Sequence, residues 1–306
     1  MNTISSILFA AFLALPATTA APPKEKTFDS AKQAADALVA AVSSDDTATM
    51  LAIFGPEGKK IVASGDEVKD KNDREKFEAL AKEKTDVVMD KANPHRAKLL
   101  IGADGWPFPV PIVETGNKWH FATSEGLREI LYRRIGQNEL DAMQVCHGYV
   151  EAQHDYASVI HDNSGVNQYA QRILSSAGKQ DGLAWYDADG KPAGPIGPAV
   201  AKALEEGYSK RTEPFHGYFF KILKAQGPAA PKGKLDYVIQ GVMIGGFALV
   251  GWPADYRATG VKTFIVSHDG ILYEKDLGPD SAKIASAMTE YNPDKTWKKV
   301  PEDAAD

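Results

Sequence analysis

Cysteine is nearly absent from this chain: Cys146 is the single one among 306 residues. A lone cysteine excludes an intramolecular disulfide, a zinc ribbon and a C-x-x-C redox pair. Basic residues are in the minority, since 35 Lys and Arg against 41 Asp and Glu give a net charge of −6. Nucleic-acid binding requires Lys and Arg that neutralise phosphates, so this charge balance predicts no nucleic-acid partner.

Long apolar runs are also missing. Residues 4–15 form a short apolar run that Pro16 ends, and Ala17-Thr18-Thr19-Ala20 follows as a small-residue cleavage motif. A bilayer span needs about 20 apolar residues, whereas this arrangement is typical of an export signal. We expect cleavage after Ala20 and a periplasmic or secreted mature chain without a transmembrane span. The alternative is that the segment is retained as an anchor.

The signatures of common enzyme classes do not occur. The sequence has no G-x-S-x-G, H-E-x-x-H, P-loop or G-x-G-x-x-G motif. Residues 176–179 match S-x-x-K, but the S-D-N and K-T-G motifs of penicillin-recognising enzymes are missing. Asp187-Ala188-Asp189-Gly190 begins like a calcium loop without its terminal Glu, which indicates a turn. No cofactor is predicted.

The first half of the chain predicts helices followed by an antiparallel sheet. Residues 21–27 are a polar tether, and Ser30-x-x-Gln33 has the form of a capping box. Asp46 is placed to cap a second helix, and a charged helix follows over about residues 72–82. Short strands are expected at residues 85–90, 97–101, 108–113 and 118–121. Prolines at alternate positions from Pro107 to Pro111 remove amides along one edge, which predicts an edge strand.

A helical stretch and a second sheet follow. Residues 124–161 predict two helices or one kinked helix, interrupted at Gly136-Gln137-Asn138. The second sheet has expected strands at residues 216–225, 242–252, 261–267 and 271–275, with Asp269-Gly270 as a hairpin turn and a closing helix from Asp280 to about Tyr291. The predicted class is α+β, with an N-terminal α+β domain at residues 28–161, a packed connector at 162–212 and a C-terminal β domain at 213–306.

Three titratable residues share one face of the expected long helix. His147, Glu151 and His154 are separated by steps of four and three, which keeps them on one side of a helix. Together they could bind one metal ion or act as acid–base groups, and Arg134 could orient an anionic substrate. The alternative is a solvated polar face with ordinary surface ion pairs. Because no complete ligand shell is visible, neither a catalytic set nor a metal site is assigned.

Several longer strings together resemble a known family. They are Asp104-Gly105-Trp106-Pro107-Phe108-Pro109, Arg133-Arg134-Ile135-Gly136-Gln137-Asn138-Glu139-Leu140, Gln144-Val145-Cys146, Tyr169-Ala170-Gln171-Arg172, His216-Gly217-Tyr218, Gly245-Gly246-Phe247-Ala248-Leu249-Val250 and Asp276-Leu277-Gly278-Pro279-Asp280. On these strings the chain resembles the bacterial domain-of-unknown-function family 2950, which implies a secreted or periplasmic protein and no particular activity. Residues 28–121 also look like an NTF2-like or cystatin-like unit with a curved sheet, and residues 216–275 look like a pilin-like sheet.

These observations favour a non-enzymatic binding or assembly module of the cell envelope, with an envelope protein or a small ligand as its partner. The alternatives are a pocket enzyme, either a hydrolase or an isomerase, and a small-ligand binding protein. Both alternatives would use the face of His147, Glu151 and His154.

Overall fold

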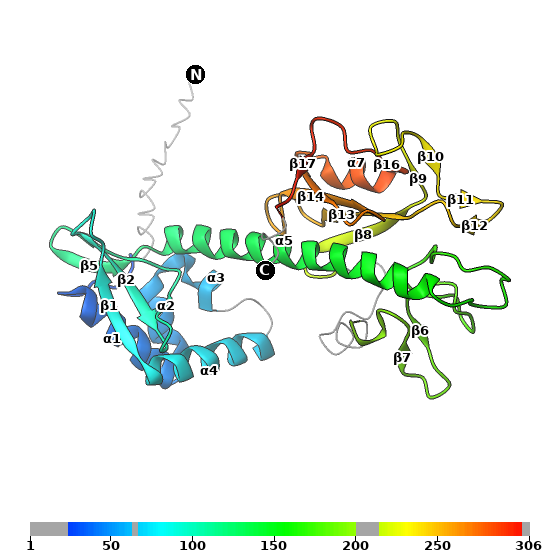
Figure 1. The fold of residues 1–306 in the computed structure, drawn as a ribbon. Helices are drawn as coiled ribbons and strands as arrows, with labels where there is room; N and C mark the ends of the chain where they lie inside the picture. The colour runs from blue at the N-terminus through cyan, green and yellow to red at the C-terminus, as the bar shows by residue number, and fades with distance from the viewer. Residues whose placement is uncertain (1–23, 63–66, 200–213, 302–306) are drawn as a thin grey trace, which may run out of the picture. The chain divides into compact units, whose positions relative to one another are not determined.

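The computed structural model describes residues 24–62, 67–199 and 214–301, so the expected export signal lies outside the described residues. The described chain forms two compact units, divided within helix α5 (Thr123–Ala157) between Glu129 and Ile130 (Figure 1). Helices and antiparallel sheets occur together, which confirms the α+β class. The finer likenesses to NTF2-like, cystatin-like and pilin-like folds stay predictions. Within the described ranges, no helix combines the length and apolarity that crossing a membrane requires.

Unit 1 packs helices against a small antiparallel sheet. Its helical elements are α1 (Ala31–Ser43), α2 (Thr47–Phe54), the 3-10 turn η1 (Pro56–Gly58), α3 (Lys59–Val62), α4 (Glu67–Glu83) and the first residues of α5. Its strands are β1 (Thr85–Met89), β2 (Arg96–Ile101), β3 (Trp106–Pro107), β4 (Ile112–Thr115) and β5 (Lys118–Phe121). The sheet order is β1-β2-β4-β5, and β3 also pairs with β2.

Local signals predicted two helix starts of unit 1 correctly. Ser30 Oγ accepts from Gln33 N at 3.1 Å, and Gln33 Oε1 accepts from the backbone N–H of Asp29, as expected for a helix start. Asp46 Oδ1 accepts from Thr49 N at 2.9 Å at the start of α2. Phe108 N donates to Leu99 O at 2.8 Å on the β2 side, and β3 has no second neighbouring strand among the described residues. The strand expected at residues 108–113 is wrong, because β3 ends at Pro107, residues 108–111 belong to no strand, and β4 lies between β2 and β5.

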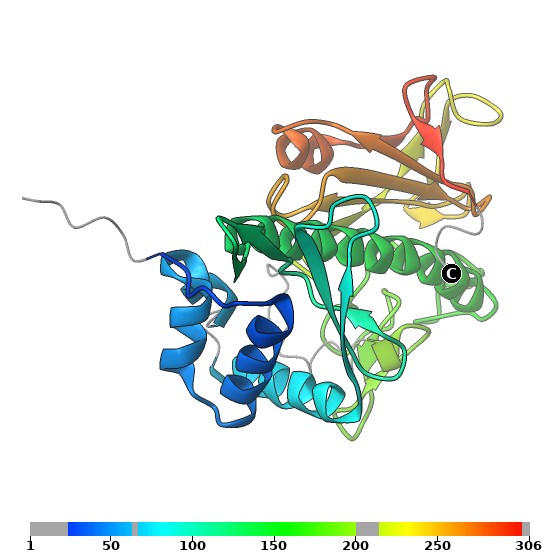
Figure 2. The same ribbon diagram turned by 90° about the vertical axis from the view of Figure 1, so that its left-hand side faces the viewer.

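Unit 2 contains the rest of α5, the connector and the second sheet. Its strands are β6 (Trp185–Tyr186), β7 (Pro192–Ala193), β8 (Tyr218–Leu223), β9 (Ala225–Gln226), β10 (Leu235–Asp236), β11 (Val238–Ile239), β12 (Val242–Met243), β13 (Ala248–Pro253), β14 (Lys262–Ser267), β15 (Leu272–Asp276), β16 (Glu290–Tyr291) and β17 (Lys298–Lys299), with helix α7 (Ser281–Ala287). The main sheet has the order β17-β15-β14-β13-β8. It lies between α5 and α7 in both views, which accounts for the burial of β13 and β14 on both faces (Figures 1 and 2).

The expected interruption of the long helix is wrong. Helix α5 continues through Gly136 and ends at Ala157 rather than at residue 161. A glycine inside a helix costs about 1 kcal/mol, but tertiary contacts hold this turn in place. Asn138 Nδ2 donates to Thr259 O at 2.8 Å, and Glu139 Oε1 accepts from two successive backbone amides, those of residues 261 and 262.

The hairpin expected at Asp269-Gly270 is confirmed, because β14 pairs with β15 and Gly270 has φ 73°. The expected strand at residues 242–252 is split into β12 and β13, and a Cβ on Gly245 would lie 2.6 Å from Asp236 O. The closing helix is shorter than expected. It ends at Ala287 because the following residues enter β16, and Asp280 forms no side-chain cap.

Candidate functional site

The structure places all three residues of the predicted histidine face on α5. His147 is half-buried on α5, and Glu151 and His154 are exposed. The ring of His154 packs edge-on toward the rings of Phe247 and Tyr169, with centroids 5.4 and 6.3 Å away. In the part of the chain that the structure describes, no group of three or more His, Cys, Asp or Glu side chains is placed to hold a metal ion. The contacts of His154 that the structure shows are thus with aromatic rings.

Arg134 is exposed on α5. It lies about three and a half turns before His147, which is about 20 Å along a helix axis. A substrate held by Arg134 would therefore lie far from the histidines unless it were extended. The structure does not combine these four residues into one site.

A buried amide instead anchors the connector to α5. Gln153 is fully buried, and its Nε2 donates to Ala170 O at 2.8 Å while its Oε1 accepts from Ala170 N at 2.8 Å. The same Nε2 lies 2.9 Å from the Tyr149 hydroxyl. One side chain thus satisfies both backbone groups of a buried residue, as a neighbouring strand would.

An aromatic stack follows at the end of α5. The ring of His161 lies on that of Tyr156, with centroids 3.9 Å apart and planes 15° apart, and Trp185 lies 5.6 Å away. His161 Nε2 is 3.0 Å from Tyr156 O, and because a carbonyl only accepts, this nitrogen carries the hydrogen. Burial, followed by the negative charges of Asp162 and Asp181, raises the pKa of Tyr156 to about 12. Tyr156 therefore remains a donor, here to Gln180 O at 2.5 Å.

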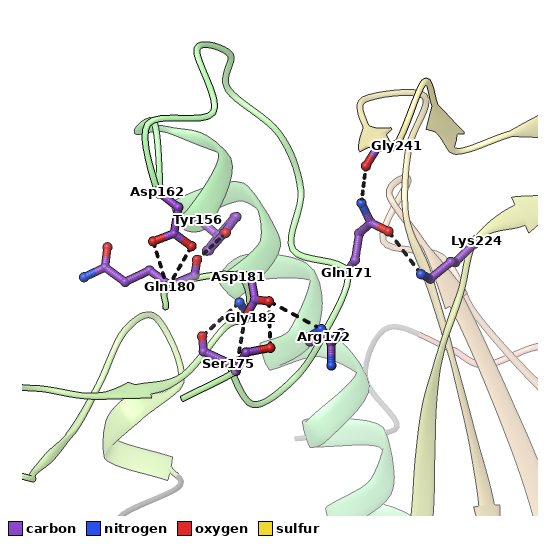
Figure 3. A network of polar contacts seen from close by, with 11 residues as sticks. Tyr156, Asp162, Gln171, Arg172, Ser175, Gln180, Asp181, Gly182, Lys224 and Gly241 are labelled. Atoms are coloured by element: carbon purple, nitrogen blue, oxygen red, sulfur yellow. Dashed lines mark hydrogen bonds and ion pairs between the residues drawn. The ribbon is translucent and has the colours of Figure 1, made fainter. Parts of the chain in front are cut away.

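Two carboxylates fix the rest of the connector (Figure 3). Asp162 accepts from Gln180 N through both oxygens at 3.1 and 3.0 Å. Asp181 accepts from Ser176 N at 2.7 Å and from Ser176 Oγ at 2.9 Å, and Arg172 Nε lies 3.5 Å away. The hydroxyl of the S-x-x-K match is therefore bound to a carboxylate, and the motif forms a turn. These acids act as structural anchors for the backbone.

A shallow depression of about 440 Å³ lies beside this network. Its lining includes Tyr156, His161, Asp162, Lys179 and Asp181. Groups of both charges and several hydroxyl and amide groups surround it, so it can accommodate a small polar molecule through hydrogen bonds.

The connector also holds a short hairpin in place. Gln171 Nε2 donates to Gly241 O at 2.7 Å, and Gln171 Oε1 accepts from Lys224 Nζ at 3.0 Å (Figure 3). Tyr169 N donates to Met243 O at 2.8 Å. Strands β11 and β12 form this hairpin, which turns at Gln240 and Gly241 with φ 52° and 85°. Positive φ at both turn residues is typical of a tight two-residue hairpin.

An Asp–His pair lies where β8 approaches α5. His216 Nδ1 is 2.5 Å from Asp141 Oδ2, and Gln137 Nε2 donates to Asp141 Oδ1 at 2.9 Å. His216 has φ 45°, a conformation that is uncommon outside glycine. The next residue, Gly217, lies so close to α5 that a Cβ on it would be 2.6 Å from Asn138 Nδ2. The pair therefore occupies a tight junction between the loop and the helix.

Sequence reasoning missed Gln153, Asp141 and His216 as interacting residues. Gln153 is a lone polar position among apolar neighbours on the core side of α5, and this pattern is the signal that could have identified it. Asp141 and His216 are 75 residues apart in sequence, and no local pattern joins them.

Comparison with known proteins identifies one family. The family model described as a protein of unknown function (DUF2950) matches residues 25–300. No curated protein and no solved structure matches the chain. The match covers nearly the whole chain, as the strings around Trp106, Arg134, Arg172 and Phe247 predicted. The chain belongs to the DUF2950 family.

Proposed function

We propose that this chain is a non-enzymatic binding module of the bacterial cell envelope that holds a protein partner on the β11–β12 hairpin. The export signal expected at residues 1–20 supports a location in the cell envelope, and the hairpin supports the binding role. The surface formed by Ile239, Val242 and Ile244 is called the hairpin patch below.

The observation that carries this proposal is that the hairpin is apolar both toward the core and toward solvent. Met243 is fully buried and Val238 packs against the core of unit 2. A hairpin with one buried face normally has a polar outer face. Here Ile239 is 45% exposed and Ile244 is 51% exposed, and Val242 pairs with Ile239 across the hairpin. Adjacent exposed branched side chains are typical of a protein contact surface.

The surroundings of the patch indicate the partner's chemistry. Lys224 is exposed and donates to Gln171, which links the connector to the hairpin. A cation beside an apolar centre favours a partner surface that is apolar in the middle and acidic at its rim. We therefore expect binding to weaken as salt is raised, because rim charges are screened within about 10 Å at 0.1 M salt.

The test uses photo-crosslinking in intact cells. A photoreactive residue is placed at Gln240, at the tip of the hairpin, and at Lys283 on α7 as a matched exposed control. We expect one envelope protein to be captured from Gln240 and not from Lys283. Ile239→Asp in the same chain should abolish the adduct, because burying an isoleucine contributes roughly 1.5–3 kcal/mol and the carboxylate would be buried without a partner against the apolar middle of the partner surface.

The control variant is Ile284→Asp, since Ile284 is 44% exposed on α7. Ile284→Asp should leave the adduct intact, and both variants should melt like the parent chain. Equal capture from Gln240 and Lys283, or an adduct that survives Ile239→Asp, would refute the proposal. Export to the cell envelope is tested separately by mass spectrometry of the N-terminus of the purified chain. The exported chain should begin at Ala21, and an uncleaved chain in the cytoplasm would contradict this expectation.

A further inference from the structure

Strand β1 forms a free edge of the sheet in unit 1. It pairs with β2 on one side, and no other strand pairs with it in the described ranges. Asp90 N donates to Arg96 O, so the even-numbered residues of this segment turn their backbone groups toward β2. The alternation of an antiparallel ladder then turns the N–H and C=O groups of Thr85, Val87 and Met89 outward.

An apolar groove runs along this edge. It has a volume of about 460 Å³ and is lined on the strand side by Thr85, Asp86, Val87 and Met89. Trp119 forms part of its wall, and Lys32 and Asp36 of α1 stand at its rim. Met89 is 44% exposed and Val88, on the other face of the strand, is 48% exposed. Protected edge strands usually carry an inward-pointing charge, a proline or a bulge. From Thr85 to Met89 there is no proline, and Asp86 is the one charged residue.

We propose that a second copy of this chain occupies the edge, with β1 paired antiparallel to its symmetry mate about a two-fold axis at Val87. In this register Val87 faces Val87 of the second copy, and Thr85 faces Met89 on each side. All three residues direct their backbone groups outward, so each facing pair can exchange two hydrogen bonds. The Met89 side chain of each copy then lies beside the groove of the other.

Charge selects this register. With the axis at Val87, Lys84 of one copy, which also lies 3.0 Å from Asp86 of its own chain, faces Asp90 of the other copy, and Asp86 faces Val88. Moving the axis by one residue toward the N-terminus places Asp86 opposite Asp86. Moving it by one residue toward the C-terminus places Asp86 opposite Asp90. Like charges directly opposite each other destabilise a strand pair, whereas opposite charges stabilise it, so the two neighbouring registers are disfavoured.

A five-residue strand is short for an interface, so we expect a reversible dimer whose population rises with protein concentration. Sedimentation equilibrium on the full mature chain measures it. The Lys84→Glu substitution places a glutamate opposite Asp90 of the other copy at both ends of the strand pair. We expect it to raise the dimer dissociation constant about tenfold. The double variant Lys84→Glu/Asp90→Lys should restore the parent value. Lys60→Glu on α3 changes the charge equally at another exposed position and should have no effect.

Disulfide trapping tests the register directly. The native thiol of Cys146 is buried, so an introduced cysteine is the reactive one. Val87→Cys places two thiols at the axis, where Cα atoms of a facing pair lie about 5.5 Å apart, within disulfide range. Val88→Cys is the matched control, because two copies of residue 88 are diagonal neighbours about 7–8 Å apart.

Random collisions would link the exposed Val88→Cys at least as fast as Val87→Cys, whereas the proposed register links Val87→Cys faster. Faster or equal linking of Val88→Cys would overturn the proposal. A parent chain that stays monomeric at high concentration, or a dimer that Lys84→Glu leaves unchanged, would overturn it too. These measurements involve unit 1 alone, so their outcome is independent of partner binding at the hairpin patch.

Discussion

Replacing Gln153 by Met should loosen the connector without creating a cavity. Gln153 is fully buried and Ala170 is 1% exposed. Methionine has a similar length and volume but neither donates nor accepts a strong hydrogen bond. Gln153→Met therefore leaves both the N–H and the carbonyl of Ala170 unpaired in a buried position, and it removes the donor to Tyr149.

The expected cost follows from these groups. A buried polar group that loses its partner costs about 1–3 kcal/mol, so two such groups lower the free energy of unfolding by about 2–6 kcal/mol. Whole-domain stabilities are typically about 5–15 kcal/mol, so the effect is large. Urea denaturation of unit 2, followed by tryptophan fluorescence, measures it. Gln171→Met is the matched control, because its hydrogen bonds to Gly241 and Lys224 lie at the exposed surface and each is worth about 0.5–1.5 kcal/mol.

The variant Gln153→Glu adds a pH-dependent test of the same contact. A carboxylate at this position would direct a charge at Ala170 O and would be buried, so burial raises its folded pKa above the ordinary value near 4.3. The protonated acid can donate to Ala170 O as the amide does. The stability difference from the parent should therefore shrink as the pH falls through the raised folded pKa, and should be smallest below about pH 4. A pH-independent difference, or a loss below about 1 kcal/mol in Gln153→Met, would refute the anchoring role of Gln153.

Three further outcomes are expected. Burial alone would raise the pKa of Asp181, but hydrogen bonds from Ser176 and the charge of Arg172 lower it overall. The stability that Asp181 contributes is therefore present above about pH 4 and is lost as the pH falls through the folded pKa. In Asp181→Asn the melting temperature should depend less on pH between about pH 5 and pH 2, and an unchanged dependence would count against this role. Burial raises the pKa of the Cys146 thiol to about 12, so iodoacetamide at neutral pH should label it only in denaturant, and labelling of the folded chain would contradict its burial. Gly217→Ala should lower the melting temperature more than Gly165→Ala does. Both glycines have positive φ (75° and 77°), but of the two only Gly217 would bring a Cβ within 4 Å of other atoms. Equal losses of melting temperature would show that the approach to α5 is not tight.

Local interactions explain what the sequence could predict. The Ser30 and Asp46 helix starts and the Asp269-Gly270 turn depend on residues within four positions of each other, and the structure confirms all three. The interruption at Gly136 was wrong because contacts from residues more than 100 positions away hold that turn. Local propensity is a weak guide where tertiary contacts of this kind oppose it.

In the candidate site, too, local spacing could be predicted from the sequence whereas long-range contacts could not. Helical spacing correctly places His147, Glu151 and His154 along one stretch of α5, but it says nothing about what faces them. His154 meets the ring of Phe247, which comes from beside β13 and lies 93 residues away in sequence. The role of Gln153 depends on a connector that folds back on the helix, and only the three-dimensional structure shows that return.

The hairpin patch is informative because its exposed side chains do little for folding. Ile239 and Ile244 are about half exposed, so polar residues there would lose little core burial, whereas Met243 must stay apolar. Threonine has a similar preference for strands and would give the hairpin a polar outer face. Exposed isoleucines on a short hairpin also carry a risk of aggregation. A chain that keeps these isoleucines beside Lys224 and Gln171 has a surface whose composition folding alone does not require, and the partner binding that we propose would explain that composition.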